Sequence, residues 1–327
     1  MLAIGGNALA PGHARGTLEE QQANATKIAR LAVRMMEQGW RVVLTHGNGP
    51  QVGNLALQHE GGAAAAVIPA QPLFVLGAMT QGQIGHMLTI ALRNAVGDAT
   101  PVAPLLTHVV VDARDPAIAR PTKPIGPFFS SDRARILAEQ RGWQIVDDAG
   151  RGFRRVVPSP QPVEILEGPA IRTLVDRGFL VVAAGGGGIP VVRRGRRLEG
   201  FDAVIDKDLT AALLATTVGA SALLLLTGID RVMLDFGTPA ERPVGEMTLE
   251  EARAYLAEGQ FPPGSMGPKV LGAIRFLEAN GRRHGGGRSA IITSARRAAA
   301  ALAGVPEGNP AGTRIVARRP SRARASS

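Results

Sequence analysis

Four lysines stand out in a chain whose basic residues are otherwise arginines. Lysine and arginine together number 37 among the 327 residues, and the only lysines are Lys27, Lys123, Lys207 and Lys269. A lysine ammonium is a compact charge with rotatable donors, whereas a guanidinium is a rigid planar fork. The last three lysines lie in segments rich in glycine or proline, so we interpret them as charges that follow a moving anionic group. The alternative is that lysine occurs at these positions by chance and has no special role. Lys27, on the polar face of an expected helix, fits this alternative.

The stretch from Phe179 to Ala215 combines two features that favour anions. Its apolar beginning predicts a buried strand, which ends in four consecutive glycines, Gly185, Gly186, Gly187 and Gly188. Beyond an arginine-rich linker, Asp206, Lys207 and Asp208 open an apolar helix. Backbone N–H groups in a glycine turn and at a helix N-terminus attract anions, and the lysine adds a full positive charge. The expected ligand is a phosphate group.

Two further glycine turns follow expected strands at residues 1–4 and 41–46. They contain Gly5, Gly6, Asn7, Gly47 and Asn48. A strand, helix, strand order implies a right-handed crossover, which places both turns at the carboxyl edge of one parallel sheet. Neither turn has the Walker pattern or the dinucleotide-binding pattern with its downstream acidic residue. Two anion-binding turns at one edge nevertheless predict a site.

The composition narrows the chemistry to phosphoryl transfer. The chain has no cysteine, and its six histidines show no metal-binding spacing, so we expect neither thiolate catalysis nor a metal held by the protein alone. Phosphoryl transfer has a loose transition state, whose spread charge is stabilised by positioned cations and amides. Asp208 is poorly suited to contact a phosphate, and we expect it to hold the lysines in position and keep them charged. For Asp206, the alternative to a role in the site is that it is a plain acidic N-cap of the helix.

Lys123 lies in a segment of different character. Residues 112–160 are rich in proline, arginine and short polar runs, and residues 143–157 predict a β-hairpin with a glycine turn. We interpret 112–160 as a small insertion that protrudes from the first domain. Prolines on both sides of Lys123 keep the backbone extended there, so that the lysine is carried on an arm.

The charge of the chain does not indicate a nucleic-acid partner. The net charge is +10 and the isoelectric point is about 11.2, values that fit nucleic-acid binding. Aromatic residues are only 4%, however, and the arginines are scattered apart from one dense run near the C-terminus. We expect residues 318–327 to be a disordered basic tail.

No part of the sequence predicts a leader or a membrane span. Met1 leads directly into a short apolar strand. The uncharged run at 209–229 is long enough to span a membrane, but Gly219 divides it into a helix and a strand at 222–226. We therefore expect a cytoplasmic protein without a membrane partner.

The expected elements predict an α/β fold in two domains. At roughly one domain per 150 residues, we place the first at 1–218 and the second at 219–317. Further helices are expected at 17–38, 79–96, 164–177, 249–258 and 270–280. Further strands are expected at 104–111, 232–236, 289–293 and 313–317, and a flexible linker at 285–287.

Several long motifs give the chain a specific resemblance. They are IGGNAL, LTHGNGPQVG, LGAMTQGQIGHML, PTKPIGPF, RRVVPSPQP, AAGGGGIPV, AVIDKDLTAALLA and GSMGPKV, spread from about Met1 to Val316. With these motifs the chain resembles the carbamate kinases of the amino acid kinase family. The resemblance implies an open αβα sandwich around a mainly parallel sheet, with a protruding subdomain, assembled as a homodimer. It also implies reversible phosphoryl transfer, in which ATP and carbamate give ADP and carbamoyl phosphate, with Mg²⁺ carried by the nucleotide.

The resemblance implies roles for individual residues. Lys207 and Lys269 would hold the transferring phosphoryl group, and Asp208 would orient them. Lys123 would reach the carbamoyl phosphate from the insertion. Amides would come from the three glycine turns, with Gly5, Gly6, Asn7, Gly47, Asn48, Gly185, Gly186, Gly187 and Gly188. The nucleotide would be contacted by Lys207, Thr227, Gly228, Asp230, Met266, Gly267 and Lys269.

Two departures from the family pattern lie on the nucleotide side. Gly228 stands where the family usually has an aspartate, and Met233 stands where an aromatic residue is usual. Two other functions remain open on the sequence. One is a kinase acting on a different carboxylate, carbamate or phosphonate, and the other is a non-catalytic ligand-binding regulator. For a carbamate kinase, we expect the reaction to run toward ATP.

Overall fold

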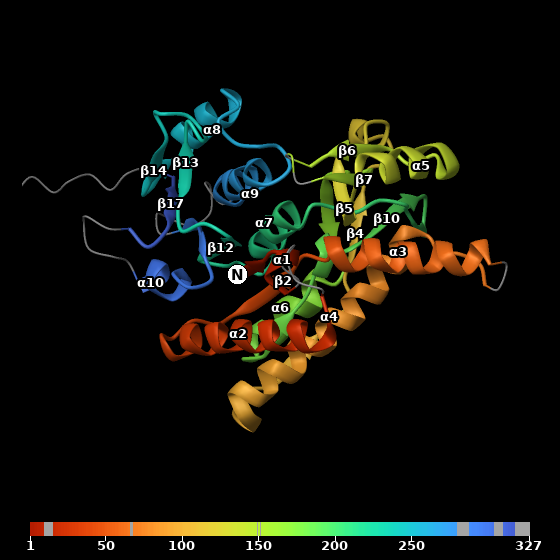
Figure 1. The fold of residues 1–327 in the computed structure, drawn as a ribbon. Helices are drawn as coiled ribbons and strands as arrows, with labels where there is room; N and C mark the ends of the chain where they lie inside the picture. The colour runs from red at the N-terminus through yellow and green to blue at the C-terminus, as the bar shows by residue number, and fades with distance from the viewer. Residues whose placement is uncertain are drawn as a thin grey trace, which may run out of the picture.

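An eight-stranded sheet forms the centre of the computed structural model, which describes residues 1–9, 16–65, 68–148, 150, 152–279, 288–303 and 310–317 (Figure 1). The strand order is β15-β17-β16-β12-β1-β2-β9-β3. Only the β16–β17 pair is antiparallel in this sheet. The strands are β1 Leu2–Ile4, β2 Val43–His46, β3 Val102–Pro104, β9 Leu180–Val182, β12 Ala222–Thr227, β15 Glu246–Thr248, β16 Ser289–Ser294 and β17 Thr313–Val316.

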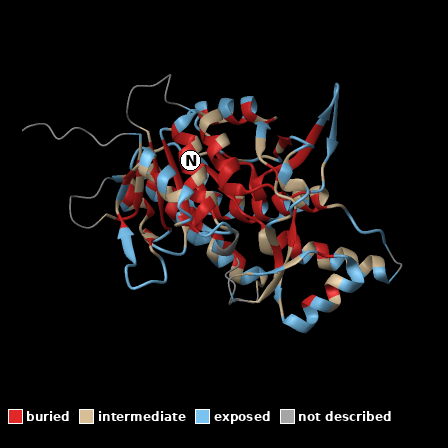
Figure 2. Cartoon of the chain, turned by 90° about the horizontal axis from the view of Figure 1, so that it is seen from above, coloured by how far each residue is buried: buried red, intermediate tan, exposed pale blue. Residues whose placement is uncertain are grey.

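Helices cover both faces of this sheet. One face packs against α2 Leu18–Glu37, α4 Leu73–Val96 and α10 Ala298–Ala303. The other face packs against α6 Gly168–Asp176, α7 Lys207–Thr217, α8 Leu249–Ala257 and α9 Met266–Glu278. Figure 2 shows the buried residues running through the middle of the molecule, between helices whose outer sides are exposed. The expected αβα sandwich around a mainly parallel sheet is confirmed.

Alternation along the central strands explains the two apolar layers. In β1, Leu2 and Ile4 belong to the core below α2 and α4, whereas Ala3 belongs to the core below α7 and α9. In β12, Leu224 and Leu225 divide in the same way. Successive side chains of a strand point to opposite faces, so a strand covered on both sides must be apolar throughout.

Smaller elements surround this sandwich. A four-stranded sheet has the order β11-β10-β4-β8, with β4 His108–Val111, β8 Pro162–Ile165, β10 Ile189–Arg194 and β11 Arg197–Gly200. A three-stranded antiparallel sheet has the order β5-β7-β6, with β5 Lys123–Phe129, β6 Ile145–Asp147 and β7 Phe153–Val157. A two-stranded sheet joins β13 Val232–Leu234 and β14 Arg242–Val244. The remaining helices are α1 Gly6–Leu9, α3 Gly49–Ala64 and α5 Ser131–Arg141, with 3₁₀ turns η1 Gly97–Ala99, η2 Pro116–Ile118 and η3 Gly185–Gly187.

Several expected elements are confirmed. The helix expected at 17–38 is α2, which begins with a capping box formed by Thr17 and Glu20. The hairpin expected within 143–157 is the β6–β7 pair, to which β5 adds a third strand. The uncharged run at 209–229 divides into α7 and β12. None of the helices in the part of the chain described here is long and apolar enough to cross a membrane.

Other expectations were wrong, mostly where the chain leaves the main sheet. The strand expected at 104–111 is two strands in different sheets, because the chain turns at Thr107, whose N–H donates to Gln81 Oε1 at 2.8 Å. The helix expected at 164–177 begins only at Gly168, since the preceding residues pair with β4. The arginine-rich linker is the β10–β11 hairpin, in which Arg193 pairs with Leu198.

Two smaller differences concern helix starts. The helix expected at 79–96 begins at Leu73, because apolar residues continue upstream. Gly6 and Asn7 belong to the short helix α1 and not to a simple turn.

The expected linker at 285–287 and the basic tail at 318–327 lie outside the described residues. The domain boundary at 218 stays a prediction.

Candidate active site

The carboxyl ends of three neighbouring parallel strands open into one cavity of about 450 Å³. The turns after β1 and β2 and the end of β12 line it, as the crossover argument predicts, together with the N-terminal turns of α3, α7 and α9. Eleven of the residues singled out from the sequence line it: Gly5, Gly47, Asn48, Lys123, Gly186, Asp206, Lys207, Asp208, Thr227, Gly228 and Lys269. Segments far apart in sequence thus meet at one edge of the sheet.

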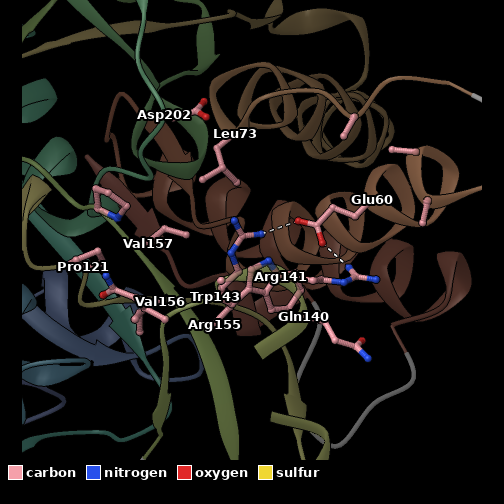
Figure 3. Close-up of a pocket in the computed structure, with 16 residues that line it drawn as sticks. Glu60, Leu73, Pro121, Gln140, Arg141, Trp143, Arg155, Val156, Val157 and Asp202 are labelled. Carbon is pink, nitrogen blue, oxygen red and sulfur yellow. Dashed lines mark hydrogen bonds and ion pairs between the residues drawn. The ribbon is translucent and has the colours of Figure 1, made fainter. Parts of the chain in front are cut away.

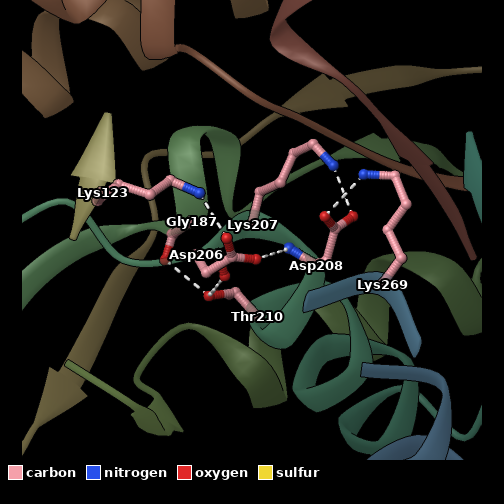
Figure 4. A network of polar contacts seen from close by, with 7 residues as sticks. All are labelled: Lys123, Gly187, Asp206, Lys207, Asp208, Thr210 and Lys269. Atoms are coloured by element: carbon pink, nitrogen blue, oxygen red, sulfur yellow. Dashed lines mark hydrogen bonds and ion pairs between the residues drawn. The ribbon is translucent and has the colours of Figure 1, made fainter. Parts of the chain in front are cut away.

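A single carboxylate lies between two lysine ammonium groups (Figure 4). Asp208 Oδ1 accepts from Lys207 Nζ at 2.5 Å, and Asp208 Oδ2 accepts from Lys269 Nζ at 3.0 Å. All three residues are more than nine-tenths buried. Gly272 lets α9 approach α7 this closely, because a Cβ at that position would lie 2.7 Å from the Asp208 carbonyl oxygen. Asp208 therefore holds the two lysines, as its expected role requires.

The buried charges shift one another's pKa values. Burial alone would raise the pKa of Asp208, but the ammonium groups of Lys207 and Lys269 outweigh burial and hold it well below its usual range. Burial lowers the pKa of Lys207 to about 8, against the opposing effect of Asp208 and with a further lowering by Lys269. The pKa of Lys269 is raised, since Asp208 outweighs burial there. At pH 7 the cluster carries more positive than negative charge.

Asp206 is the expected N-cap, and it also makes a lysine contact that the sequence did not indicate. Its Oδ1 accepts from the Asp208 N–H at 2.8 Å, which makes it the N-cap of α7. Its Oδ2 contacts Lys123 Nζ, so β5 brings the third lysine to the cavity (Figure 4). Burial would raise the pKa of Asp206, but Lys123 outweighs it and the pKa is lowered. The side chain of Lys123 is 25% exposed, against 11% for Lys207, so Lys123 lies nearer to solvent.

The four consecutive glycines are required by close contacts on every side. A Cβ on any of them would lie within 2.4 Å of another atom. The nearest atoms would be His46 Nε2, Asn48 Nδ2, the Ile205 carbonyl oxygen and Val109 Cγ2, in the order of the glycines. Gly186, Gly187 and Gly188 also have positive φ, which glycine adopts without strain. No residue with a side chain fits this turn.

Polar contacts fix the glycine turn from behind. Gln81 Nε2 donates to the Gly185 carbonyl at 3.0 Å, and Thr210 Oγ1 donates to the Gly187 carbonyl at 2.9 Å. Burial lowers the pKa of His46 to about 4, so the imidazole against Gly185 is neutral at pH 7. The turn is thus held rigidly without a nearby positive charge from histidine.

Some expected site residues do not line the cavity. The Asp230 carboxylate accepts from Ser294 Oγ at 2.5 Å and from Arg296 Nη2 at 2.8 Å. Met266 packs in the core below α9, and the Gly267 N–H donates to the Pro262 carbonyl at 2.9 Å. Gly185, Gly187 and Gly188 do not line it either. The surroundings of Gly6 and Asn7 lie outside what the structure describes. Roles of these eight residues in binding stay predictions.

Two charged residues that the sequence analysis did not single out, Asp148 and Arg154, line the same cavity. Arg154 Nη1 lies 3.1 Å from Asp148 Oδ2, and Arg154 Nε donates to the Gly126 carbonyl at 3.1 Å. Arg154 belongs to the motif RRVVPSPQP, but one arginine among many carries no distinguishing signal. Only the pairing of β7 with β5, which carries Lys123, could have pointed to it.

Two carboxylates of the cavity have lysine partners. Asp206 and Asp208 both accept from lysines, and among the described residues no three histidine, aspartate or glutamate side chains gather as metal ligands. Mg²⁺ prefers oxygen ligands and is commonly held by substrate phosphates and only one or two carboxylates. The residues present therefore fit a magnesium ion that arrives bound to the phosphates of a nucleotide.

Comparison with known proteins identifies the family of the chain. The model of the amino acid kinase family matches residues 2–294. The carbamate kinase of Thermococcus kodakarensis is 46% identical over 308 residues, which are 93% of this chain and 96% of the relative. Carbamate kinase from Giardia lamblia bound to citric acid has a TM-score of 0.87 at 41% identity, covering 96% of this chain and 97% of the other. The same enzyme bound to AMP-PNP has a TM-score of 0.82 at 42% identity, with the same coverage.

The chain belongs to the amino acid kinase family. Within that family it is a carbamate kinase, and hence a phosphotransferase.

The pKa of Lys207 predicts how activity depends on pH. Because this pKa is lowered to about 8, the ammonium is charged at pH 7 and loses its proton as the pH rises through 8. The loss removes positive charge from the cavity, so we expect kcat/KM for carbamoyl phosphate to fall about tenfold between pH 7 and pH 9. Lys207→Arg keeps its charge at pH 9, so its own profile should be flat over this range, whatever its absolute rate. A flat profile for the unmodified enzyme, or an equal decline in the variant, would show that Lys207 does not titrate there.

Proposed function

We propose that the protein transfers the phosphoryl group of carbamoyl phosphate to ADP, forming ATP and carbamate. A terminal oxygen of ADP attacks the phosphorus, the bond from phosphorus to the carbamate oxygen breaks, and carbamate leaves with that electron pair. The observation that carries the proposal is the cluster of three lysines and two aspartates beside the glycine turn. The cluster has one positive charge in excess, which is what a transferring phosphoryl group requires.

The lysines take different roles in this proposal. Lys207 and Lys269, fixed by Asp208, contact the phosphoryl group as it passes between the substrates. Lys123 leaves Asp206 to contact carbamoyl phosphate. It can reach this substrate because β5, which begins with Lys123, belongs to the three-stranded sheet beside the cavity. Backbone N–H groups around Gly47 and Gly186 complete the contacts to the oxygen atoms.

The nucleotide is proposed to occupy the side of the cavity near β12. Thr227 and Gly228 line that side, and the loop before α9 contributes Gly264 and Ser265. The solved structure of a relative with AMP-PNP supports a nucleotide site. Mg²⁺, bound to the nucleotide phosphates, supplies positive charge to the oxygens of the transferring group.

Direct assay tests the reaction. With purified protein, ADP, carbamoyl phosphate and Mg²⁺, we expect ATP to form at least a hundredfold faster than in the absence of protein. Chelation of Mg²⁺ with EDTA should abolish this rate, because phosphate charge is then uncompensated. The absence of ATP above the background of spontaneous carbamoyl phosphate breakdown would refute the proposal.

Alanine variants separate the roles of the lysines. Lys269→Ala removes a buried contact to the transferring group, so we expect kcat to fall by about 10²- to 10³-fold. Lys123→Ala should raise KM for carbamoyl phosphate by roughly tenfold while ADP affinity changes less than about twofold. Steady-state kinetics and calorimetric titration with ADP measure both effects.

The fourth lysine provides the matched control for these variants. Lys27 lies exposed on α2, where its Nζ donates to Asn24 Oδ1 at 3.1 Å. Lys27→Ala should leave kcat, KM and ADP affinity unchanged. If Lys123→Ala weakened ADP binding as strongly as Lys269→Ala, the assignment of Lys123 to carbamoyl phosphate would be wrong.

We further propose that the protein is a homodimer, formed at the β3 edge of the main sheet. Met79, His86 and Ile90 lie exposed on one side of α4, and Leu106 lines the same small cavity as His86. Large apolar side chains grouped in this way mark interaction surfaces. A second copy of the chain would cover them.

The dimer proposal is tested by placing a charge on that surface. Leu106→Asp buries an unpaired carboxylate in a dimer, so we expect monomers in sedimentation equilibrium. Leu18→Asp is the control, because Leu18 has the same exposed fraction of 55% but lies at the start of α2. A monomeric unmodified protein, or dimers of Leu106→Asp as stable as those of the control, would contradict the proposal.

A further inference from the structure

Helix α3 connects the cavity to the sheet that carries Lys123. Its first residues, Gly49 and Pro50, line the cavity directly after the turn of Gly47 and Asn48. The helix then runs along β5, whose first residue is Lys123 (Figure 1). The position of Lys123 therefore depends on how α3 and β5 are joined.

The junction nearest to the cavity is a contact between two glycines. Gly53 lies in the second turn of α3 and is buried, and Gly126 lies on β5. A Cβ placed on Gly53 would lie 1.9 Å from Gly126 Cα and 2.1 Å from Gly126 N. Real Cβ atoms do not approach backbone so closely, so any side chain at Gly53 must push β5 away from α3.

A second junction lies about two turns further along the helix (Figure 3). Glu60 Oε1 accepts from Arg155 Nη1 of β7 at 3.0 Å, and Glu60 Oε2 contacts Arg141 Nη1 of α5. The Arg155 guanidinium carbon lies 4.5 Å from the ring centroid of Trp143. One carboxylate of α3 thereby holds the strand next to β5 and the helix beside it.

The glycine junction is linked to the other partner of Lys123 as well. Val52 of α3 and Ile125 of β5 share one buried apolar cluster with Val204, which lies two positions before Asp206. Lys123 lies three residues from Gly126, about 10 Å along an extended strand. A displacement of β5 at Gly126 therefore moves Lys123 relative to Asp206 and the cavity.

We propose that Gly53 and Glu60 are positioning residues for Lys123. The Gly53–Gly126 contact sets how far Lys123 enters the cavity, and Glu60 keeps the three-stranded sheet in that orientation. The proposal rests on the function proposed above for Lys123, namely contact with carbamoyl phosphate. It assigns a task to two motif glycines, in LTHGNGPQVG and PTKPIGPF, that do not line the cavity.

A double-mutant cycle between Gly53→Ala and Lys123→Ala tests the proposal. Alone, Gly53→Ala should lower kcat/KM for carbamoyl phosphate by up to about tenfold, and by no more than Lys123→Ala itself, because small misplacements of a catalytic group are costly. ADP affinity should change less than about twofold, since neither Gly53 nor Gly126 lines the cavity that contains Thr227 and Gly228. In the Lys123→Ala background, the added Gly53→Ala should change kcat/KM less than about twofold, because the group that it misplaces is already gone.

Gly61→Ala is the matched control on the same helix. A Cβ on Gly61 would meet no atom within 4 Å, and alanine is a better helix former than glycine. This variant should keep the kcat/KM of the unmodified enzyme. If Gly61→Ala lost as much activity as Gly53→Ala, the loss would come from α3 in general and the positioning role would be wrong.

Glu60→Gln carries the test if Gly53→Ala does not fold. Glutamine keeps the volume of the side chain but loses the charge that holds Arg141 and Arg155. It should lower kcat/KM for carbamoyl phosphate about three- to tenfold, again only when Lys123 is present. If the loss from Glu60→Gln or Gly53→Ala multiplied fully with that of Lys123→Ala, or if ADP binding fell equally, the positioning role would be wrong. The role proposed for Lys123 would then still stand. Unchanged carbamoyl phosphate kinetics in Lys123→Ala itself would overturn the role of Lys123 and this inference with it.

Discussion

The structure depends on one carboxylate that neutralises only one of two buried ammonium groups. Removing each charge from water costs several kcal/mol, and a buried ion pair recovers this only with close, well-directed contacts. Asp208 provides such contacts to Lys207 and Lys269, but a single negative charge cannot compensate both. In the proposed function, a phosphoryl group compensates the remaining positive charge. The charge of the cavity therefore favours an anion.

This arrangement constrains the elements around it. Helices α7 and α9 must approach until the Asp208 backbone lies against Gly272, which excludes any side chain at that position. The hydroxyl of Thr210 ties α7 to the glycine turn through the Gly187 carbonyl. The turn, the helix N-terminus and the lysines thus move as one unit, and a shift in any of them would change the distances between charge and substrate. Rigid positioning of this kind is what electrostatic catalysis requires.

Much of this site could be predicted from the sequence, because its components are local. Glycine turns after apolar strands, and charged residues that open apolar helices, are patterns within short segments. They singled out Lys207, Asp208 and the turn of four glycines, and the structure brings Lys207, Asp208 and Gly186 to one cavity. The crossover rule, which concerns neighbouring strands, brought Gly5 and Gly47 to the same edge.

What could not be predicted depends on pairings between distant segments. The Lys123–Asp206 contact joins residues 83 positions apart, and no periodicity indicates it. Arg154 reaches the cavity only because β7 pairs with β5 in a particular register. The turn at Thr107, which moves β4 into a second sheet, depends on a side-chain contact from Gln81. Sequence patterns indicate which elements form, whereas these contacts depend on how the elements meet.

Asp206 shows how one side chain can serve two purposes without conflict. Its two oxygens have separate partners, the Asp208 N–H at the start of α7 and the ammonium of Lys123. In the exchange proposed for Lys123, the bond from the Asp208 N–H to Asp206 can remain, so α7 keeps its cap and the other lysines keep their positions. Lys207 also lowers the pKa of Asp206, against the opposing effects of burial and of Asp208, and so favours its charged form. Exchange of one lysine between a carboxylate and a substrate therefore costs little, because the negative charge of Asp206 is never left without a nearby cation.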